Sequence, residues 1–97
     1  HVMDLAEAHI SALNYLISND PQIVYLNIGT GTGNTILDVV NIFNEKCIEN
    51  LSYEFVEKRP GDEPYVVADN SLALKLLDWN PNRNLSEMCR DSINSNI

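Results

Sequence analysis

Four stretches of the chain carry apolar residues at the three- and four-residue spacing of an amphipathic helix. Each begins at residues whose side chains commonly cap a helix, namely Asp4, Thr35, the run Asp69-Asn70-Ser71, and Asn84. Asp38 and Glu87 each follow a cap by three residues, as in a capping box. We therefore predict four helices, which cover about residues 4–17, 35–46, 72–77 and 84–93.

Two shorter stretches have the pattern of β-strands. Residues 23–28 are mostly apolar, as in a strand that is buried on both faces, and residues 52–56 show the alternation of a short strand. Because a predicted helix separates them, a parallel pair in a small α/β lobe is the economical arrangement. Two strands alone make a poor sheet, so we expect polypeptide outside the chain to supply a further strand or a packing surface.

Composition excludes several classes of protein. The 97 residues fit one small domain with a net charge of -8, and the six Lys and Arg residues are scattered, whereas nucleic acid binding needs a clustered basic surface. No apolar run approaches the ~20 residues of a membrane span. Cys47 and Cys89 lack the spacing of metal ligands, so we expect reduced thiols, no metal site and a cytoplasmic location. His9 has no partner spaced for catalysis and is interpreted as a hydrogen-bonded structural residue.

A glycine-rich segment follows the first predicted strand and invites a dinucleotide-binding interpretation. The N-terminus of a helix can bind phosphate, and Glu54 and Glu57 follow at about the distance of a ribose-binding acid. However, the glycines are Gly29, Gly31 and Gly33, whereas the fingerprint requires Gly-x-Gly-x-x-Gly. We therefore assign no cofactor-binding residue here and predict a tight strand-to-helix connection.

The best candidate for ligand chemistry is the loop Arg59-Pro60-Gly61-Asp62. Pro60 fixes its own φ and biases Arg59 towards an extended backbone, while Gly61 permits a turn with positive φ. In such a shaped loop the Arg59 guanidinium suits a bidentate grip on phosphate, and Asp62 can accept hydrogen bonds from sugar hydroxyls. The alternative is a solvated turn with a surface ion pair.

Seven short blocks, taken together with their order and spacing, give the chain a resemblance to a known family. The blocks are residues 1–6 with 8–9, 25–31, 36–40, 59–62, 68–69, 79–81 and 85–91. Through them the whole chain resembles the C-terminal part of the UDP-glucose 4-epimerases, in the extended short-chain dehydrogenase/reductase superfamily. The first block and the loop at 59–62 also occur in relatives that act on other nucleotide-sugars, such as 4,6-dehydratases.

The resemblance implies that residues 1–97 are the C-terminal nucleotide-sugar-binding portion of an NAD-dependent epimerase. The fold would be a small α/β lobe, with short parallel strands and four helices, that lacks the main Rossmann sheet. The parent enzyme, a cytoplasmic homodimer, would interconvert UDP-glucose and UDP-galactose through a 4-keto intermediate. NAD and the catalytic Tyr-x-x-x-Lys pair would lie in a missing N-terminal portion, which leaves the chain without a catalytic residue and inactive by itself.

The resemblance also implies the substrate-binding residues. Arg59 would bind the UDP diphosphate and Asp62 the uridine ribose. The position that gates tolerance of N-acetylated sugars aligns with Val66, or with Tyr65 if the loop shifts by one residue, and a small side chain there would admit the N-acetyl form. Two alternatives remain, namely a non-catalytic α/β interaction module and the same lobe of a related nucleotide-sugar dehydratase or decarboxylase.

Overall fold

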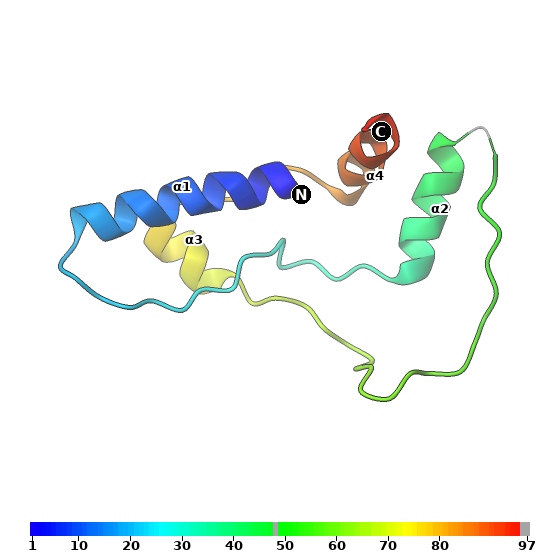
Figure 1. Cartoon of the computed structure of the whole chain (residues 1–97), viewed down its shortest axis with the longest axis horizontal. Helices are drawn as coiled ribbons and strands as arrows, with labels where there is room; N and C mark the ends of the chain where they lie inside the picture. The colour runs from blue at the N-terminus through cyan, green and yellow to red at the C-terminus, as the bar shows by residue number, and fades with distance from the viewer. Residues whose placement is uncertain (48, 96–97) are drawn as a thin grey trace. The chain divides into compact units, whose positions relative to one another are not determined.

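The computed structural model of the chain describes residues 1–47 and 49–95. Within these residues the regular secondary structure consists of four helices, whose order along the chain is shown in Figure 1. The chain divides into two compact units, each built from two separate segments. The first unit comprises His1–Gly33 and Val67–Arg83, and the second comprises residues 34–66 and the segment from Asn84 onward.

The first unit is organised around the packing of α1 (Val2–Ser18) against α3 (Ser71–Leu77). Ala8 of α1 and Ala73 of α3 are almost completely buried, because small side chains let the two helices approach closely. The buried core is completed by Leu77 and by Trp79, which confirms the core role predicted for the tryptophan. Partly buried apolar side chains surround this core, namely Ala12, Tyr15, Leu26, Ile28 and Leu74.

The start of α1 differs from the prediction. The helix begins at Val2 and its N-cap is His1, whose Nδ1 accepts a hydrogen bond from the backbone N–H of Met3 at 3.0 Å. Asp4 is therefore not the cap but a residue of the first turn, where a carboxylate is favoured by the helix dipole. Its side chain is buried, and this burial gives it the role described below.

The second unit packs α2 (Ile36–Lys46) against α4 (Leu85–Asn94), with Cys89 of α4 buried. Both predicted capping boxes are confirmed. The Thr35 hydroxyl accepts from the Asp38 backbone N–H at 3.0 Å, and the Asp38 carboxylate accepts from the Thr35 N–H at 2.7 Å. The box at the start of α4 has the same reciprocal form, with distances of 2.9 and 2.8 Å.

The predicted α/β class is wrong, because no strand occurs in residues 1–47 and 49–95. Residues 23–28 and 52–56 run as irregular chain, and neither segment forms a β-ladder with the other. The prediction of a strand buried on both faces also fails, since Ile23 is 83% exposed and Tyr25 is 86% exposed. A hydrophobic pattern indicates which residues favour a strand, but a strand exists only where a second one accepts its backbone hydrogen bonds.

Candidate functional site

The loop at residues 59–62 is a tight turn in the second unit. The backbone N–H of Asp62 donates to the carbonyl of Arg59 at 3.2 Å, and Gly61 has a φ of 86°. A proline at the second position and a glycine with positive φ at the third are typical of a type II turn. The shaped loop expected from Pro60 and Gly61 is therefore present.

The two charged side chains of this turn bind each other. Arg59 donates from Nε to Asp62 Oδ2 at 3.0 Å and from Nη2 to Asp62 Oδ1 at 3.3 Å. The Arg59 side chain is 83% exposed and that of Asp62 is 42% exposed. The turn thus places a guanidinium and a carboxylate side by side in a position that a ligand can reach.

The third predicted site residue, Val66, lies four residues beyond Asp62. Val66 is 81% exposed and its neighbour Tyr65 is 80% exposed. Exposure therefore does not distinguish the two alignments that the sequence left open. Both residues, like Arg59 and Asp62, belong to the second unit, whereas a pocket of about 230 Å³ beside Trp79 belongs to the first.

The glycine-rich segment has a packing role. A Cβ on Gly29 would lie 2.8 Å from the Cβ of Ala68, and Gly31 adopts a φ of 74° next to Asn70. The Asn70 side chain donates to the Gly29 carbonyl at 2.8 Å, which ties the segment to the chain just before α3. These glycines are needed because residues 67–70 pass close to them. The first turn of α2 is capped by the side chains of Thr35 and Asp38. This geometry gives the glycine-rich segment a packing role within the first unit.

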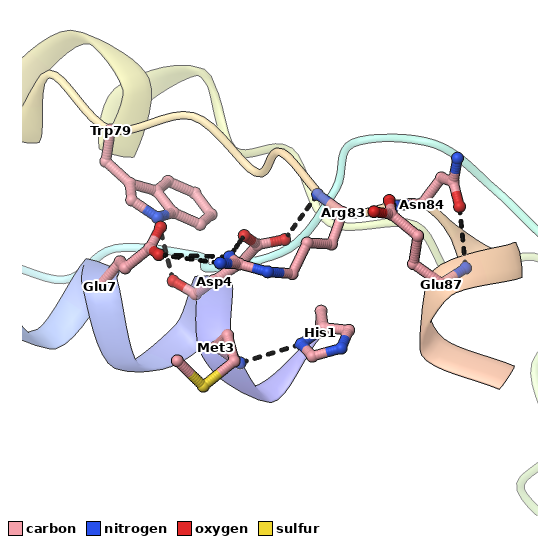
Figure 2. Close-up of polar contacts among 8 residues, drawn as sticks. All are labelled: His1, Met3, Asp4, Glu7, Trp79, Arg83, Asn84 and Glu87. Atoms are coloured by element: carbon pink, nitrogen blue, oxygen red, sulfur yellow. Dashed lines mark hydrogen bonds and ion pairs between the residues drawn. The ribbon is translucent and has the colours of Figure 1, made fainter. Parts of the chain in front are cut away.

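A polar cluster that the sequence analysis missed is centred on Asp4 (Figure 2). Its carboxylate accepts from the Arg83 guanidinium at 2.5 Å and from the Arg83 backbone N–H at 3.1 Å. Arg83 also donates to Glu7 Oε1 at 3.2 Å, and the indole of Trp79 donates to the Asp4 carbonyl at 3.0 Å. The cluster joins the first turn of α1 to the chain that follows α3. Its partners are more than 70 residues apart, so no local pattern could have revealed it.

Two opposing effects determine the pKa of Asp4. Burial by itself would raise the pKa, but hydrogen bonds from the backbone and guanidinium of Arg83 and from the backbone of Asn82 outweigh it. The pKa of Asp4 is therefore lowered below its ordinary value. The carboxylate is the form that the folded chain stabilises.

The remaining histidine and cysteine side chains singled out by the sequence lie outside these two clusters. Nδ1 of His9 is hydrogen-bonded to the carbonyl of Leu5 at 2.8 Å, as expected for a structural histidine. Cys47 and Cys89 are free thiols. Across the described ranges 1–47 and 49–95, no group of three or more His, Cys, Asp and Glu residues is placed to hold a metal ion. Among the same residues, no helix is both long enough and apolar enough to cross a bilayer.

Comparison with solved structures indicates the class of protein to which this geometry is similar. A crystal structure of UDP-glucose 4-epimerase from Bifidobacterium longum, in complex with NAD+ and UDP, matches 97% of the chain with a TM-score of 0.86 and 32% sequence identity. The chain covers 28% of that protein. The fold described above is therefore similar to part of an enzyme that epimerises a nucleotide-sugar. No protein-family model matches the chain.

The curated relatives that match the chain are also UDP-glucose 4-epimerases. UDP-glucose 4-epimerases from Bacillus subtilis and Dictyostelium discoideum are 40% and 41% identical over 92 residues, which is 95% of the chain. A rice enzyme, UDP-glucose 4-epimerase 3, is 40% identical over 95 residues. The chain spans about 27% of the length of the first two relatives. The resemblance to UDP-glucose 4-epimerases is thus confirmed over nearly the whole chain.

Proposed function

We propose that the chain is the substrate-binding part of a UDP-glucose 4-epimerase. In the complete enzyme, UDP-glucose and UDP-galactose would be interconverted through a 4-keto intermediate, with bound NAD as the hydride carrier. The observation that carries the proposal is the match of 97% of the chain to an epimerase crystallised with NAD+ and UDP. Two finer statements extend it: the complete protein would be a cytoplasmic homodimer, and the 97 residues alone would be inactive.

The exposed turn at residues 59–62 supports a diphosphate-binding role. The chain has a net charge of -8, which repels an anionic ligand at long range, so a nucleotide-sugar must be held by local donors. Arg59 offers such donors on a turn whose shape is set by Pro60 and Gly61. We propose that Arg59 binds the UDP diphosphate and that Asp62 binds the ribose hydroxyls.

The proposal is tested in a hybrid enzyme in which residues 1–97 replace the matching segment of the Bacillus subtilis epimerase. We expect this hybrid to convert UDP-galactose to UDP-glucose. Arg59→Ala should weaken UDP binding by about ten- to a hundredfold, the contribution of a charged bidentate contact, while the free energy of unfolding stays nearly unchanged. Isothermal titration of UDP and thermal unfolding measure the two effects.

Lys58→Ala is the matched control, because Lys58 carries the same charge on the preceding, exposed residue. We expect that variant to bind UDP almost as tightly as the unaltered hybrid. Equal losses from Arg59→Ala and Lys58→Ala would reduce the effect to general charge and remove the diphosphate assignment. A folded hybrid that retains NAD but has no epimerase activity would contradict the proposed function and favour a non-catalytic module.

A second test concerns sugar preference. We propose that the small side chain of Val66 admits N-acetylated substrates, because a larger group there would occupy the space of the acetyl. Val66→Tyr in the hybrid should then lower turnover of UDP-GlcNAc relative to UDP-glucose, and Tyr65→Val serves as the control for the alternative alignment. If the unaltered hybrid turned over UDP-GlcNAc no better than Val66→Tyr, the gating assignment would be dropped.

A further inference from the structure

We infer that Asp62 is a positioning residue that orients the Arg59 guanidinium for phosphate, in addition to any contact of its own with the nucleotide. The inference rests on the proposed function, because it assumes that Arg59 meets the diphosphate. The question is how the guanidinium of the exposed Arg59, on a chain with a net charge of -8, is oriented towards an anionic ligand. The observations that carry it are the turn and the two hydrogen bonds within it.

The backbone turn brings the two side chains together. Arg59 and Asp62 are the first and fourth residues of the turn, and the Asp62 N–H closes it on the Arg59 carbonyl at 3.2 Å. Gly61, with a φ of 86°, has nothing within 4 Å of the position of a Cβ, so its requirement for glycine comes from backbone conformation and not from crowding. The pair is therefore preorganised by the backbone before any ligand arrives.

The hydrogen bonds occupy one edge of the guanidinium and leave the other edge in a defined direction. Asp62 accepts from Nε and Nη2, which form the side edge of the planar group. The end edge, formed by Nη1 and the second hydrogen of Nη2, points away from the carboxylate in the same plane. A phosphate can bind bidentately on that end edge while Asp62 stays on the side edge. Asp62 thus need not be displaced when the ligand binds.

Fixing the guanidinium lowers the cost of binding. Without Asp62, an arginine side chain that is 83% exposed would sample many rotamers, and ordering it on binding would cost conformational entropy. The carboxylate removes part of this cost in advance, while it also reduces the local positive charge. Orientation outweighs the reduction in charge, so loss of Asp62 weakens phosphate binding beyond any loss of a ribose contact.

A double-mutant cycle in the hybrid enzyme tests this, with UDP and uridine as the two probes. Asp62→Ala should weaken UDP binding by about two- to fivefold more than it weakens uridine binding, in line with an exposed ion pair. In the Arg59→Ala background this excess for UDP should disappear. If Asp62 contacts only ribose, the loss is equal for UDP and uridine in both backgrounds, and the inference is overturned. Tighter UDP binding by Asp62→Ala would also overturn it, because the carboxylate would then compete with phosphate.

Two further measurements separate this inference from the proposed function. Glu63→Ala is the matched control, since it removes the neighbouring exposed carboxylate, and it should not weaken UDP binding. In the 97-residue chain without ligand, the ¹⁵N resonance of Arg59 Nε should shift on Asp62→Ala and not on Glu63→Ala. An Nε resonance that ignores Asp62 would overturn the positioning role whatever the hybrid binds. Failure of the hybrid to bind either probe would instead contradict the proposed function.

Discussion

Asp4 shows how one buried side chain can hold two distant parts of the chain together. It is 2% exposed, and its carboxylate accepts both the backbone N–H and the guanidinium of Arg83, while its carbonyl accepts from Trp79. Removing the charge of a buried, hydrogen-bonded carboxylate leaves its donors without a full partner. Stability should therefore depend on the ionised form of this residue.

We predict that Asp4→Asn lowers the free energy of unfolding by roughly 1–3 kcal/mol at neutral pH. The folded-state pKa of Asp4 lies below the ordinary value of 3.8, so its contribution is fully present above that value and is lost as pH falls through the lower, folded-state pKa. The difference between wild type and Asp4→Asn should thus close in strongly acidic solution. Urea unfolding between pH 2 and 7, followed by fluorescence of Trp79, the single tryptophan, measures it.

Glu7→Gln is the control for this prediction. Glu7 also accepts from Arg83, but its side chain is 43% exposed, so solvent can replace the lost interaction. We expect a much smaller change in stability at neutral pH than Asp4→Asn produces. Equal effects of the two substitutions would show that Arg83, and not the burial of Asp4, determines the cluster.

At the scale of elements, the helices could be predicted and the strands could not. The capping boxes of α2 and α4 were predicted correctly because each joins residues three positions apart, so the sequence contains the whole interaction. The N-cap of the first helix was predicted at Asp4, three residues after the observed N-cap, His1. The side chain of His1 accepts the hydrogen bond that Asp4 was expected to accept. Residues 23–28 and 52–56 have strand-like patterns, but a ladder requires a partner that local sequence does not specify.

The glycine-rich segment provides a test at this scale. We predict that Gly29→Ala destabilises the first unit by roughly 1–3 kcal/mol, because the new methyl would lie 2.8 Å from the Ala68 Cβ. Ala68→Gly in the same chain should restore most of the loss by removing the opposing methyl. Thermal unfolding of the two single variants and the double variant measures the coupling. Additive losses in the double variant would show that crowding against Ala68 is not the cause.

At the scale of the whole molecule, the side chains proposed to bind the nucleotide are exposed. Arg59 and Asp62 are on an exposed turn, and large apolar side chains such as Tyr25 and Phe55 are also mostly exposed. The chain spans about 27% of the length of its Bacillus subtilis relative. The proposed function requires further polypeptide to complete the ligand contacts of such an exposed turn.

We therefore predict that the 97-residue chain alone binds neither UDP nor NAD appreciably. One charged contact contributes about ten- to a hundredfold in affinity, which by itself corresponds to a dissociation constant of millimolar or weaker. Isothermal titration of each ligand into the chain should give heats close to those of dilution, whereas the hybrid enzyme should bind UDP measurably. Micromolar binding of UDP by the chain alone would mean that these residues already form a complete pocket.

The sequence by itself determined the helices, the shape of the turn at Pro60 and Gly61, and the resemblance to UDP-glucose 4-epimerases. These features depend on residues close together along the chain or on the order of short motifs. Only the tertiary structure decided that Asp4 binds Arg83, that Gly29 faces Ala68, and that the strand-like segments are unpaired. The physical reason is that each of these outcomes depends on a partner dozens of residues away, and neither periodicity nor residue type identifies which distant groups will meet.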